Sequence, residues 1–401
     1  MTFASADRVQ LAYTPEVTPG VTPANGISRK LRMTGESLAF DLTKTPDSEI
    51  TADAQPTSST TTNASAAGDI NLHVQYAEYD PLIAGVLRSA WVPHGTDGVS
   101  APFDADFTVN SIIADAAPTG LNAFTRLQPG QWFRLNTPAG HKVLRVSTTV
   151  APTGTVLTLD PNTPLAVGDA AACTISTSRL SNGIDLRSFT VEKQATDIDQ
   201  YFTFRGMHPS KLSMQFATES DTKGSISFMG FSHELTESTK LPGTLEDSNP
   251  YEIHNGVVGV GQLWENGTPA NIKVRNLSFD VDSGLRQQTA LGTLGAVGMG
   301  IGTIAVTGSI TLYFEDGRMY DKYAKDTYTS LIFSTLDVDG NGYVITIPKV
   351  MLGQGRVVAG GKNSDLMAEF QIEALADRRN PVAALKKTVI IDRIGAAVEA
   401  V

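Results

Sequence analysis

The chain has 401 residues, of which 41% are hydrophobic and 18% are charged. This length corresponds to two or three domains, and the ordinary content of Gly and Pro (36 and 20 residues) excludes collagen-like and wholly disordered chains. The formal net charge is −11, from 42 acidic and 31 basic residues. This balance argues against a surface that grips nucleic-acid phosphates, because such surfaces need clustered Lys and Arg.

No feature of the sequence places the chain in a membrane or in an oxidising compartment. Cys173 is the single cysteine, so no intrachain disulfide is possible, and its apolar neighbours predict a buried, unreactive thiol. The N-terminus lacks the basic and apolar regions of a secretory signal, so we expect none. Residues 290–314 carry no charge, but repeated glycines and a period-two second half favour a glycine-rich loop that leads into a strand.

The first unusual segment along the chain is Thr43–Gly68. It contains Pro46, Pro56 and a run of Ser and Thr, with few large apolar side chains. Such a composition cannot build a core of its own. We therefore expect a long irregular loop between two strands, and a loop of this length is usually functional or ordered by a partner.

A helix and an insertion follow. Asp80 is expected to be the N-cap of the helix, since Pro81 suits the first helical position. Short strands separated by Pro and Gly turns then fill Asp104–Ser178, which is typical of a small barrel or sandwich. We predict an inserted domain (104–178) within a discontinuous first unit (1–103 and 179–250), followed by a second unit (251–401).

Most of the remaining chain alternates apolar and polar residues with a period of two, which predicts strands with one buried face. The apolar positions are Leu212, Met214 and Phe216; Ile226 and Phe228; Leu277, Phe279 and Val281; and Leu366, Ala368, Phe370 and Ile372. The chain is therefore predicted to be mainly β.

Two short sequences recur at nearly one spacing, which indicates an internal duplication. Leu38–Leu42 resembles Leu277–Val281 (277 − 38 = 239), and Gly68–Leu72 resembles Gly308–Leu312 (308 − 68 = 240). In both copies a long loop (43–68 and 287–303) separates two strands, and a predicted helix follows, after Asp80 and after Asp321. The expected fold is two β-sandwich or barrel units, each with a flanking helix, plus the small inserted β-barrel.

The sequence offers no convincing catalytic, cofactor or metal site. Asp337–Gly342 resembles the start of an EF-hand calcium loop, but the twelfth position is Pro348, so an Asp-Gly/Asn-Gly hairpin turn is favoured and cation binding stays open. Gly256–Gly261 lacks the Lys-Ser/Thr that completes a phosphate-binding loop. The six histidines show no paired metal spacing. We predict no catalytic residue, no cofactor and no metal.

Five stretches carry a resemblance to a known family. They are Leu11–Glu16; Gly35–Asp41; Ala66–Asn71 leading to Glu78–Pro81; Asn182-Gly183 leading to Ser188–Lys193; and Phe204–Met207 leading to Ser227–Gly230. Together they resemble the major tail tube proteins of long flexible-tailed (siphovirus-type) bacteriophages.

The resemblance implies a structural virion protein, not an enzyme, whose sheets join around a ring and whose rings stack into a tube for DNA ejection. Loops 43–68 and 287–303 are then expected to make ring and stack contacts and to be mobile in the free subunit. The expected partners are the chain itself, a tape measure protein in the lumen, and tail terminator and distal tail proteins. DNA would pass without specific binding, which the acidic balance favours. The protein would assemble in the host cytoplasm and reside in the virion tail.

Alternatives remain at the level of sequence. A decoration or fibre protein would also be β-rich, and a carbohydrate-binding or carbohydrate-degrading protein would need aromatic platforms, for which there are three Trp (Trp91, Trp132 and Trp264). Rings of the resembled family typically have sixfold symmetry, so a chain with two units would close a ring as a trimer. If the repeat is coincidental, a hexamer is expected. The inserted domain is expected on the outside of the tube and to be dispensable for polymerisation.

Overall fold

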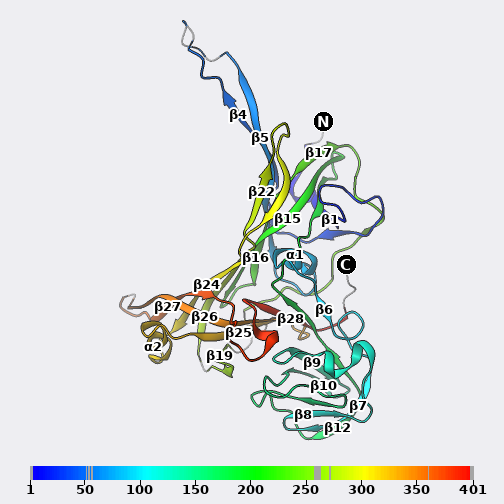
Figure 1. Ribbon diagram of the computed structural model, residues 1–401, viewed down its shortest axis with the longest axis vertical. Coiled ribbons are helices and arrows are strands. Elements are labelled where there is room, and N and C mark those ends of the chain that lie inside the picture. Colours follow the sequence, from blue (N-terminus) through cyan, green and yellow to red (C-terminus); the bar gives the residue numbers. More distant parts are fainter. Residues whose placement is uncertain are drawn as a thin grey trace.

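The computed structural model of the chain describes residues 3–50, 52, 55, 57–256, 263–270, 272–359 and 361–397 (Figure 1). These residues form a sheet of 20 strands, a separate six-stranded sheet, a two-stranded hairpin and two α-helices. The prediction of a mainly β chain is confirmed.

The first half of the large sheet comes from both sides of the insertion. Its elements are β1 (Val9–Pro15), β2 (Ser28–Leu31), β3 (Gly35–Glu36), β4 (Ala39–Pro46), β5 (Ser59–His73), α1 (Asp80–Val86), β6 (Val92–Pro93), β13 (Ser178–Ser181), β14 (Phe189–Ala195), β15 (Gln200–Ala217), β16 (Lys223–Gly230), β17 (Ser232–Thr236) and β18 (Leu245–Glu246). Apolar residues of these strands and of α1 form one core, which includes Leu11, Ile70, Leu82 and Phe228.

The six-stranded sheet, which we call the insert, has its own core. Its strands are β7 (Phe103–Thr108), β8 (Ser111–Ala114), β9 (Trp132–Thr137), β10 (Gly140–Arg145), β11 (Val156–Thr158) and β12 (Gly168–Ser176). They follow the order β10-β9-β12-β7-β8-β11. A bridge between Val146 and Leu159, directly after the two outermost strands, closes the sheet on itself. Phe124, Phe133 and Ile175 are among its fully buried side chains.

The second half of the large sheet follows in one run. Its elements are β19 (Trp264–Glu265), β20 (Thr268–Pro269), β21 (Val274–Asp282), β22 (Leu285–Thr289), β23 (Ala296–Ile301), β24 (Ala305–Tyr313), α2 (Arg318–Ala324), β25 (Thr329–Leu336), β26 (Gly342–Ala359), β27 (Leu366–Ala374) and β28 (Ile390–Ile394). The pair β22 and β23 forms the separate two-stranded hairpin.

The two halves repeat one pattern of pairing. Antiparallel neighbours run β14–β15–β16–β5–β4 in the first half and β25–β26–β27–β24–β21 in the second. The strands β15 and β26 both have 18 residues, and each changes partner along its length. Each helix is followed by a residue with positive φ, Arg88 (53°) and Asp326 (50°). The two short sequence repeats lie in strands that occupy the same places in this pattern, β4 and β21, and β5 and β24.

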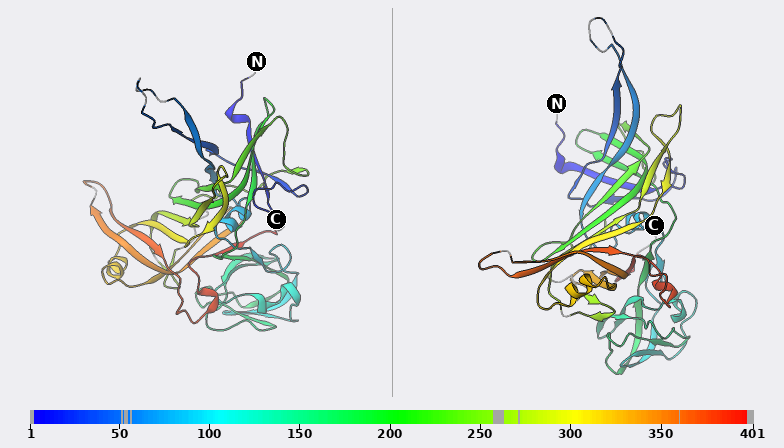
Figure 2. Two further views of the ribbon diagram at one scale, coloured as in Figure 1. Left: turned by 45° about the horizontal axis from the view of Figure 1, so that its top comes forward. Right: turned by 60° about the vertical axis from the view of Figure 1, so that its left-hand side comes forward.

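The halves join through β15 and β21, which pair antiparallel from Lys211↔Asp282 to Ala217↔Asn276. The apolar residues of both strands face the same core, where Phe216 and Phe279 each lie edge-on to Phe333. The result is a single curved sheet that continues across the two halves (Figure 2).

Both predicted loops are in fact β-hairpins. Segment 43–68 continues the ladder of β4 and β5 out to Pro46↔Ser59 and extends away from the body, opposite the insert (Figure 1). Small and hydroxyl side chains alternate along this segment. It can form a hairpin without a core because the ladder itself supplies hydrogen bonds to the backbone N–H and C=O groups. The Asp47 carboxylate holds the end of the ladder by accepting hydrogen bonds from Thr57 and Ser58, including one of 2.7 Å from the Ser58 amide. Segment 287–303 likewise contains most of the β22–β23 hairpin.

The helix predicted after Asp80 is present, but its N-cap residue is not the predicted one. The helix α1 begins at Asp80, and Tyr79 is its N-cap. The Asp80 side chain is engaged elsewhere, because its carboxylate accepts a hydrogen bond of 2.6 Å from the Tyr343 hydroxyl and pairs with Arg393. A carboxylate held in this way is not available to the amides of the first helical turn.

Candidate assembly surfaces

Two strands of the large sheet each have a side that, over at least part of its length, pairs with no other described strand. In the part of the chain that the structure describes, β4 has β5 as its single ladder partner, and residues 351–359 of β26 pair with β27 alone. An exposed strand edge offers a row of unpaired N–H and C=O groups to another chain. Both edges are therefore candidates for contact with a further copy of the chain.

The two free edges correspond to two strands that already pair with each other inside the chain. Strand β21 corresponds to β4 and strand β15 corresponds to β26 in the repeated pairing pattern. Since β15 and β21 are joined within the chain, the free edges of β26 and β4 are the two halves of the same kind of contact. The internal ladder covers residues 211–217 of β15, a length that each free edge can match.

One face of the large sheet is polar. Between the buried apolar positions the strands carry small hydroxyl and amide side chains, which include Asn71, Ser213, Gln215, Ser225, Ser278, Ser309 and Gln371. The charged residues at these alternate positions include Asp41, Asp69, Asp280, Asp282, Glu369 and Glu373 against Lys44, Lys211, Lys223 and Arg356. Carboxylates outnumber cations on this face, so its potential is negative.

The β22–β23 hairpin lies on the first half of its own chain. The Gln287 side-chain amide donates a hydrogen bond of 3.2 Å to the Gly230 carbonyl, and Arg88 donates one of 2.9 Å to the carbonyl of Gly302, which follows the hairpin. Gly295 has φ of 91°, and a Cβ added there would lie 3.2 Å from the Ala64 carbonyl oxygen. The 287–303 segment thus makes contacts within the chain.

The β4–β5 hairpin, here called the arm, is different. Nearly all described residues of the arm between positions 41 and 63 are exposed, and Leu42 and Ile50 are large apolar side chains open to solvent. The hydrogen bonds of its outer part, such as Thr45 to Thr62 at 3.2 Å, are internal to the arm. A long exposed hairpin of this kind needs a partner to bury it.

The sequence motifs considered for chemistry have structural explanations. Asp337 closes the turn between β25 and β26, because its carboxylate accepts hydrogen bonds from the backbone amides of Asp339 (2.9 Å) and Asn341 (2.8 Å). The predicted hairpin turn is therefore found there. Among the described residues no group of three or more His, Cys, Asp and Glu could hold a metal ion. The candidate phosphate loop lies largely outside the described residues, since positions 257–261 are not among them.

The buried thiol and two of the buried imidazoles are likewise unsuited to catalysis. Cys173 is fully buried, and burial raises the pKa of its thiol, which is the reverse of what a nucleophile needs. Burial also lowers the pKa of His94 and of His254 to about 4, so both imidazoles are neutral near pH 7. His254 contacts the Thr335 hydroxyl (2.9 Å). Within the described part of the chain, neither histidine is hydrogen-bonded to a carboxylate or a thiol that would activate it.

The sequence of the chain matches a known protein family. A model of the phage tail tube protein family matches residues 6–374, nearly the whole chain. The chain belongs to the phage tail tube protein family. No characterised protein matches the sequence significantly. Membership confirms the resemblance found in the sequence and identifies a structural component of the virion tail. The structural nature of the family also favours a non-enzymatic role for this tail tube protein.

Two further findings concern this tail tube protein. No helix among its described residues is long and apolar enough to cross a membrane. Sequence analysis did not predict the free edge of β26. The sequence held one indication of it, because the long strands β15 and β26 come after corresponding helices in the two halves. The edge itself becomes visible only when the partners of each strand are known.

Proposed function

We propose that this tail tube protein assembles into rings by pairing the free edge of β26 in one chain with β4 of the next, and that the rings stack into the conduit for DNA ejection. The observation that carries the proposal is the internal ladder between β15 and β21. This ladder joins two copies of one unit, so repeating it between chains continues the same sheet around a ring.

The two sequence repeats set the register of this contact. Across the sheet, Asn71 pairs with Ser225, Ser225 with Ser213, and Ser213 with Asp280. In the second half, the corresponding row begins with Thr311, which pairs with Glu369, which pairs with Arg356. Asp280 corresponds to Asp41 in the repeat Leu38–Leu42. Arg356 therefore faces Asp41 of the next chain in the proposed ring.

The proposed pair is chemically complementary. The Arg356 side chain is 72% exposed and already pairs with Glu369 at 2.8 Å, so it can bridge two carboxylates. Asp41 is exposed on the arm strand β4. An exposed pair of this type contributes little energy, but it selects one register over a slip of two residues.

The polar face of the sheet is proposed to line the lumen. Its small hydroxyl and amide side chains offer no hydrophobic patch for a passing molecule, and its excess of carboxylates repels phosphates. The helices α1 and α2 and the insert then belong to the tube exterior. By family resemblance, a tape measure protein occupies the lumen before ejection, and tail terminator and distal tail proteins contact the ends. Assembly in the host cytoplasm fits a chain with a single cysteine.

Two copies of the unit per chain lead to a proposed trimeric ring with six pseudo-equivalent positions. The division into a discontinuous first unit, an inserted domain and a second unit is part of this proposal. The arm provides the second contact, because it projects from β4 beyond the proposed junction and is placed to reach a neighbouring chain or ring. The alternatives are a decoration or fibre protein, and a hexameric ring.

Cysteine cross-linking tests the proposal directly. In a Cys173→Ala background, Asp41→Cys with Arg356→Cys should form disulfides between chains, and only under conditions that give tubes in electron micrographs. The matched control is Ser213→Cys with Asp280→Cys, which pair within the chain and should cross-link at any concentration. Tubes that form without any disulfide between positions 41 and 356, while the control pair cross-links, would contradict the proposed junction. Protein that remains monomeric when concentrated would contradict ring assembly itself.

A further inference from the structure

The C-terminal strand β28 lies where three parts of the chain meet. It pairs on one side with β13 of the first half, from Ser178↔Arg393 to Ser181↔Ile390. On the other side it pairs with β26 of the second half, from Gly342↔Ile394 to Thr346↔Ile390. This strand follows the family match, which ends at residue 374. It therefore belongs to a part of the chain that family membership does not explain.

Asp392, in the middle of β28, binds groups from the two other parts. Its carboxylate forms a bidentate pair with Arg179 of β13, at 2.7 Å and 2.8 Å, and accepts a hydrogen bond of 3.0 Å from the Trp132 amide of the insert. Asp392 is fully buried and Arg179 is 5% exposed. A buried carboxylate with three charge-assisted or amide donors is well satisfied. Two donors come from Arg179 of β13 and one from Trp132 of β9, so Asp392 fixes two other elements.

A second buried cluster lies beside the first. Arg393 of β28 pairs with Asp80 of α1 and donates a hydrogen bond of 3.1 Å to the Ser178 hydroxyl. Asp80 also accepts the hydrogen bond from Tyr343 of β26. Burial by itself would lower the pKa of Arg393, but the Asp80 carboxylate raises it, so the guanidinium stays charged. This cluster again links the first half, through α1, with the second half, through β26 and β28.

Apolar side chains complete the junction. Trp132 of the insert lies edge-on to Trp264 of β19 with ring centroids 5.0 Å apart. Both rings pack with Ile332, Val344 and Ile394 in a small core that is separate from the core of the insert. Around its rim, Arg134 donates hydrogen bonds to the Asp339 carbonyl (3.1 Å) and the Asn341 side chain (3.0 Å).

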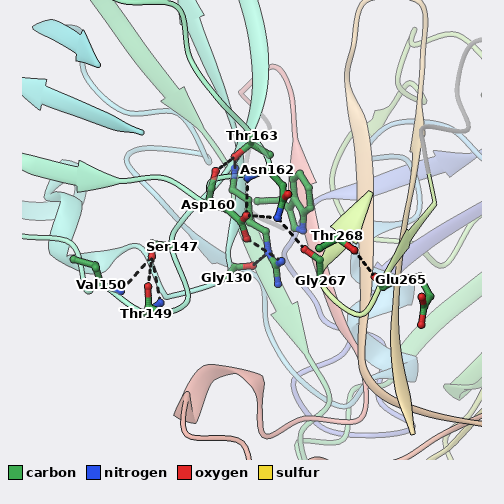
Figure 3. A network of polar contacts seen from close by, with 12 residues as sticks. Gly130, Ser147, Thr149, Val150, Asp160, Asn162, Thr163, Glu265, Gly267 and Thr268 are labelled. Atoms are coloured by element: carbon green, nitrogen blue, oxygen red, sulfur yellow. Dashed lines mark hydrogen bonds and ion pairs between the residues drawn. The ribbon is translucent and has the colours of Figure 1, made fainter. Parts of the chain in front are cut away.

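Polar contacts extend this docking toward the β19–β20 turn (Figure 3). Asn162 of the insert donates a hydrogen bond of 3.4 Å to the Gly267 carbonyl. Asn162 is itself held by Asp160, which pairs with the buried Arg145 of the insert at 3.3 Å. The insert is thus bound to the second half of the chain at several points, although its sequence interrupts the first half.

We infer that β28 is an intramolecular latch, which fixes the angle between the two halves across the β15–β21 ladder and anchors the insert to both halves. Without β28, β13 would lose one ladder, and the small tryptophan core would lose Ile394. Arg179 and Asp80 would each lose the charged partner that β28 supplies. The ladder between the halves would then be able to open and close. The inference concerns the single chain and does not depend on tube assembly.

Hydrogen exchange on the free chain tests the latch. The variants are Asp392→Ala and a chain that ends after Asp377, and the matched control is Asp316→Asn, which removes an exposed ion pair with Arg318. We expect amides of β13 and of the β15–β21 ladder to exchange at least tenfold faster in both latch variants. Amides of β7 and β8 in the core of the insert should keep their rates, and the control should match the unmodified chain.

Two outcomes would overturn the inference. One is unchanged exchange across the β15–β21 ladder in the truncated chain, which would show that the halves hold together without β28. The other is equal acceleration of all strands, including β7 and β8, which would show a general loss of stability. If Asp392→Ala does not fold, the pair Arg179→Gln with Asp392→Asn keeps a neutral hydrogen bond, and the same comparison of strands applies to it.

Discussion

Arg179 and Asp392 form a buried bidentate ion pair across 213 residues of sequence, with N–O distances of 2.7 and 2.8 Å. The pair connects a strand that directly follows the insert with the last strand of the chain. Burying two charges costs free energy that a close pair recovers only while both partners are present. The stability of the chain should therefore be more sensitive to either residue alone than to both together.

This asymmetry gives the first prediction. Asp392→Ala or Arg179→Ala should each lower the free energy of unfolding by about 3–5 kcal/mol, because each leaves an unpaired buried charge. The double variant Arg179→Met with Asp392→Leu should be closer to the unmodified protein than either single variant. Urea unfolding monitored by tryptophan fluorescence measures the difference. Additive losses in the double variant would contradict the coupling.

The second prediction concerns pH. The pKa of His94 and of His254 falls to about 4 in the folded chain because burial disfavours the charged imidazole. The unfolded chain, with a histidine pKa near 6.5, binds more protons between these values. Stability should therefore be complete above about pH 6.5 and should decline as the pH falls toward 4, by roughly 2–3 kcal/mol per histidine near pH 4.5.

Urea unfolding at pH 7.0 and at pH 4.5 tests this dependence. His94→Gln should reduce the difference in stability between the two pH values, since glutamine does not titrate and both ring nitrogens of His94 lack a hydrogen-bond partner among the described residues. The exposed His141 is the matched control, and His141→Gln should leave the difference unchanged. An equal pH dependence in all three proteins would contradict the assignment.

The limits of sequence analysis are clear from particular residues. The repeats at Leu38 and Leu277, and at Gly68 and Gly308, lie in strands with equivalent pairing, so local sequence alone pointed to the repeated pairing pattern. The composition of the segment around Thr43 shows that it cannot form a core, which predicts an irregular loop. The structure differs because a hairpin needs no core of its own where its ladder of backbone hydrogen bonds is continuous. The partnership of Asp392 and Arg179 could not be predicted, since nothing local marks two charges so far apart as neighbours.

The third prediction concerns the arm. Its backbone amides from Thr43 to Thr45 and from Ser59 to Thr62 should exchange rapidly in the free chain, because the hairpin is exposed and two strands alone are marginally stable. Assembly should slow them, since the proposed contacts bury one edge and the exposed side chains. Hydrogen exchange on free chains and on tubes compares the two states. Equal rates in both would contradict a role of the arm in assembly.

The fourth prediction revises the expectation that the insert is dispensable. The strands of the insert run from residue 103 to residue 176, and Ser178 already belongs to β13. Replacing residues 103–176 with a Gly/Ser linker removes Trp132 and exposes Trp264, Ile332 and Val344. It also removes the amide that binds Asp392. We expect the shortened chain to be less stable and to aggregate. Adding Trp264→Ser should recover solubility, and tube formation by that recovered protein would show that the insert serves the single chain rather than the tube wall.

The last prediction is the symmetry of the ring. In the proposed arrangement each chain carries two units joined by the β15–β21 ladder, and in the described part of the chain a free β26 edge and a free β4 edge remain. If the family's ring has six unit positions, three chains fill it, and the inserts project at three positions. The junction within each chain is held by the latch, β28. Among the described residues there is no second copy of β28 that could hold the junction between two chains. Tubes should therefore separate between chains and not within them, and image averaging should show three outer protrusions in each ring. Six identical protrusions in each ring would contradict the trimer and would assign one chain to each position.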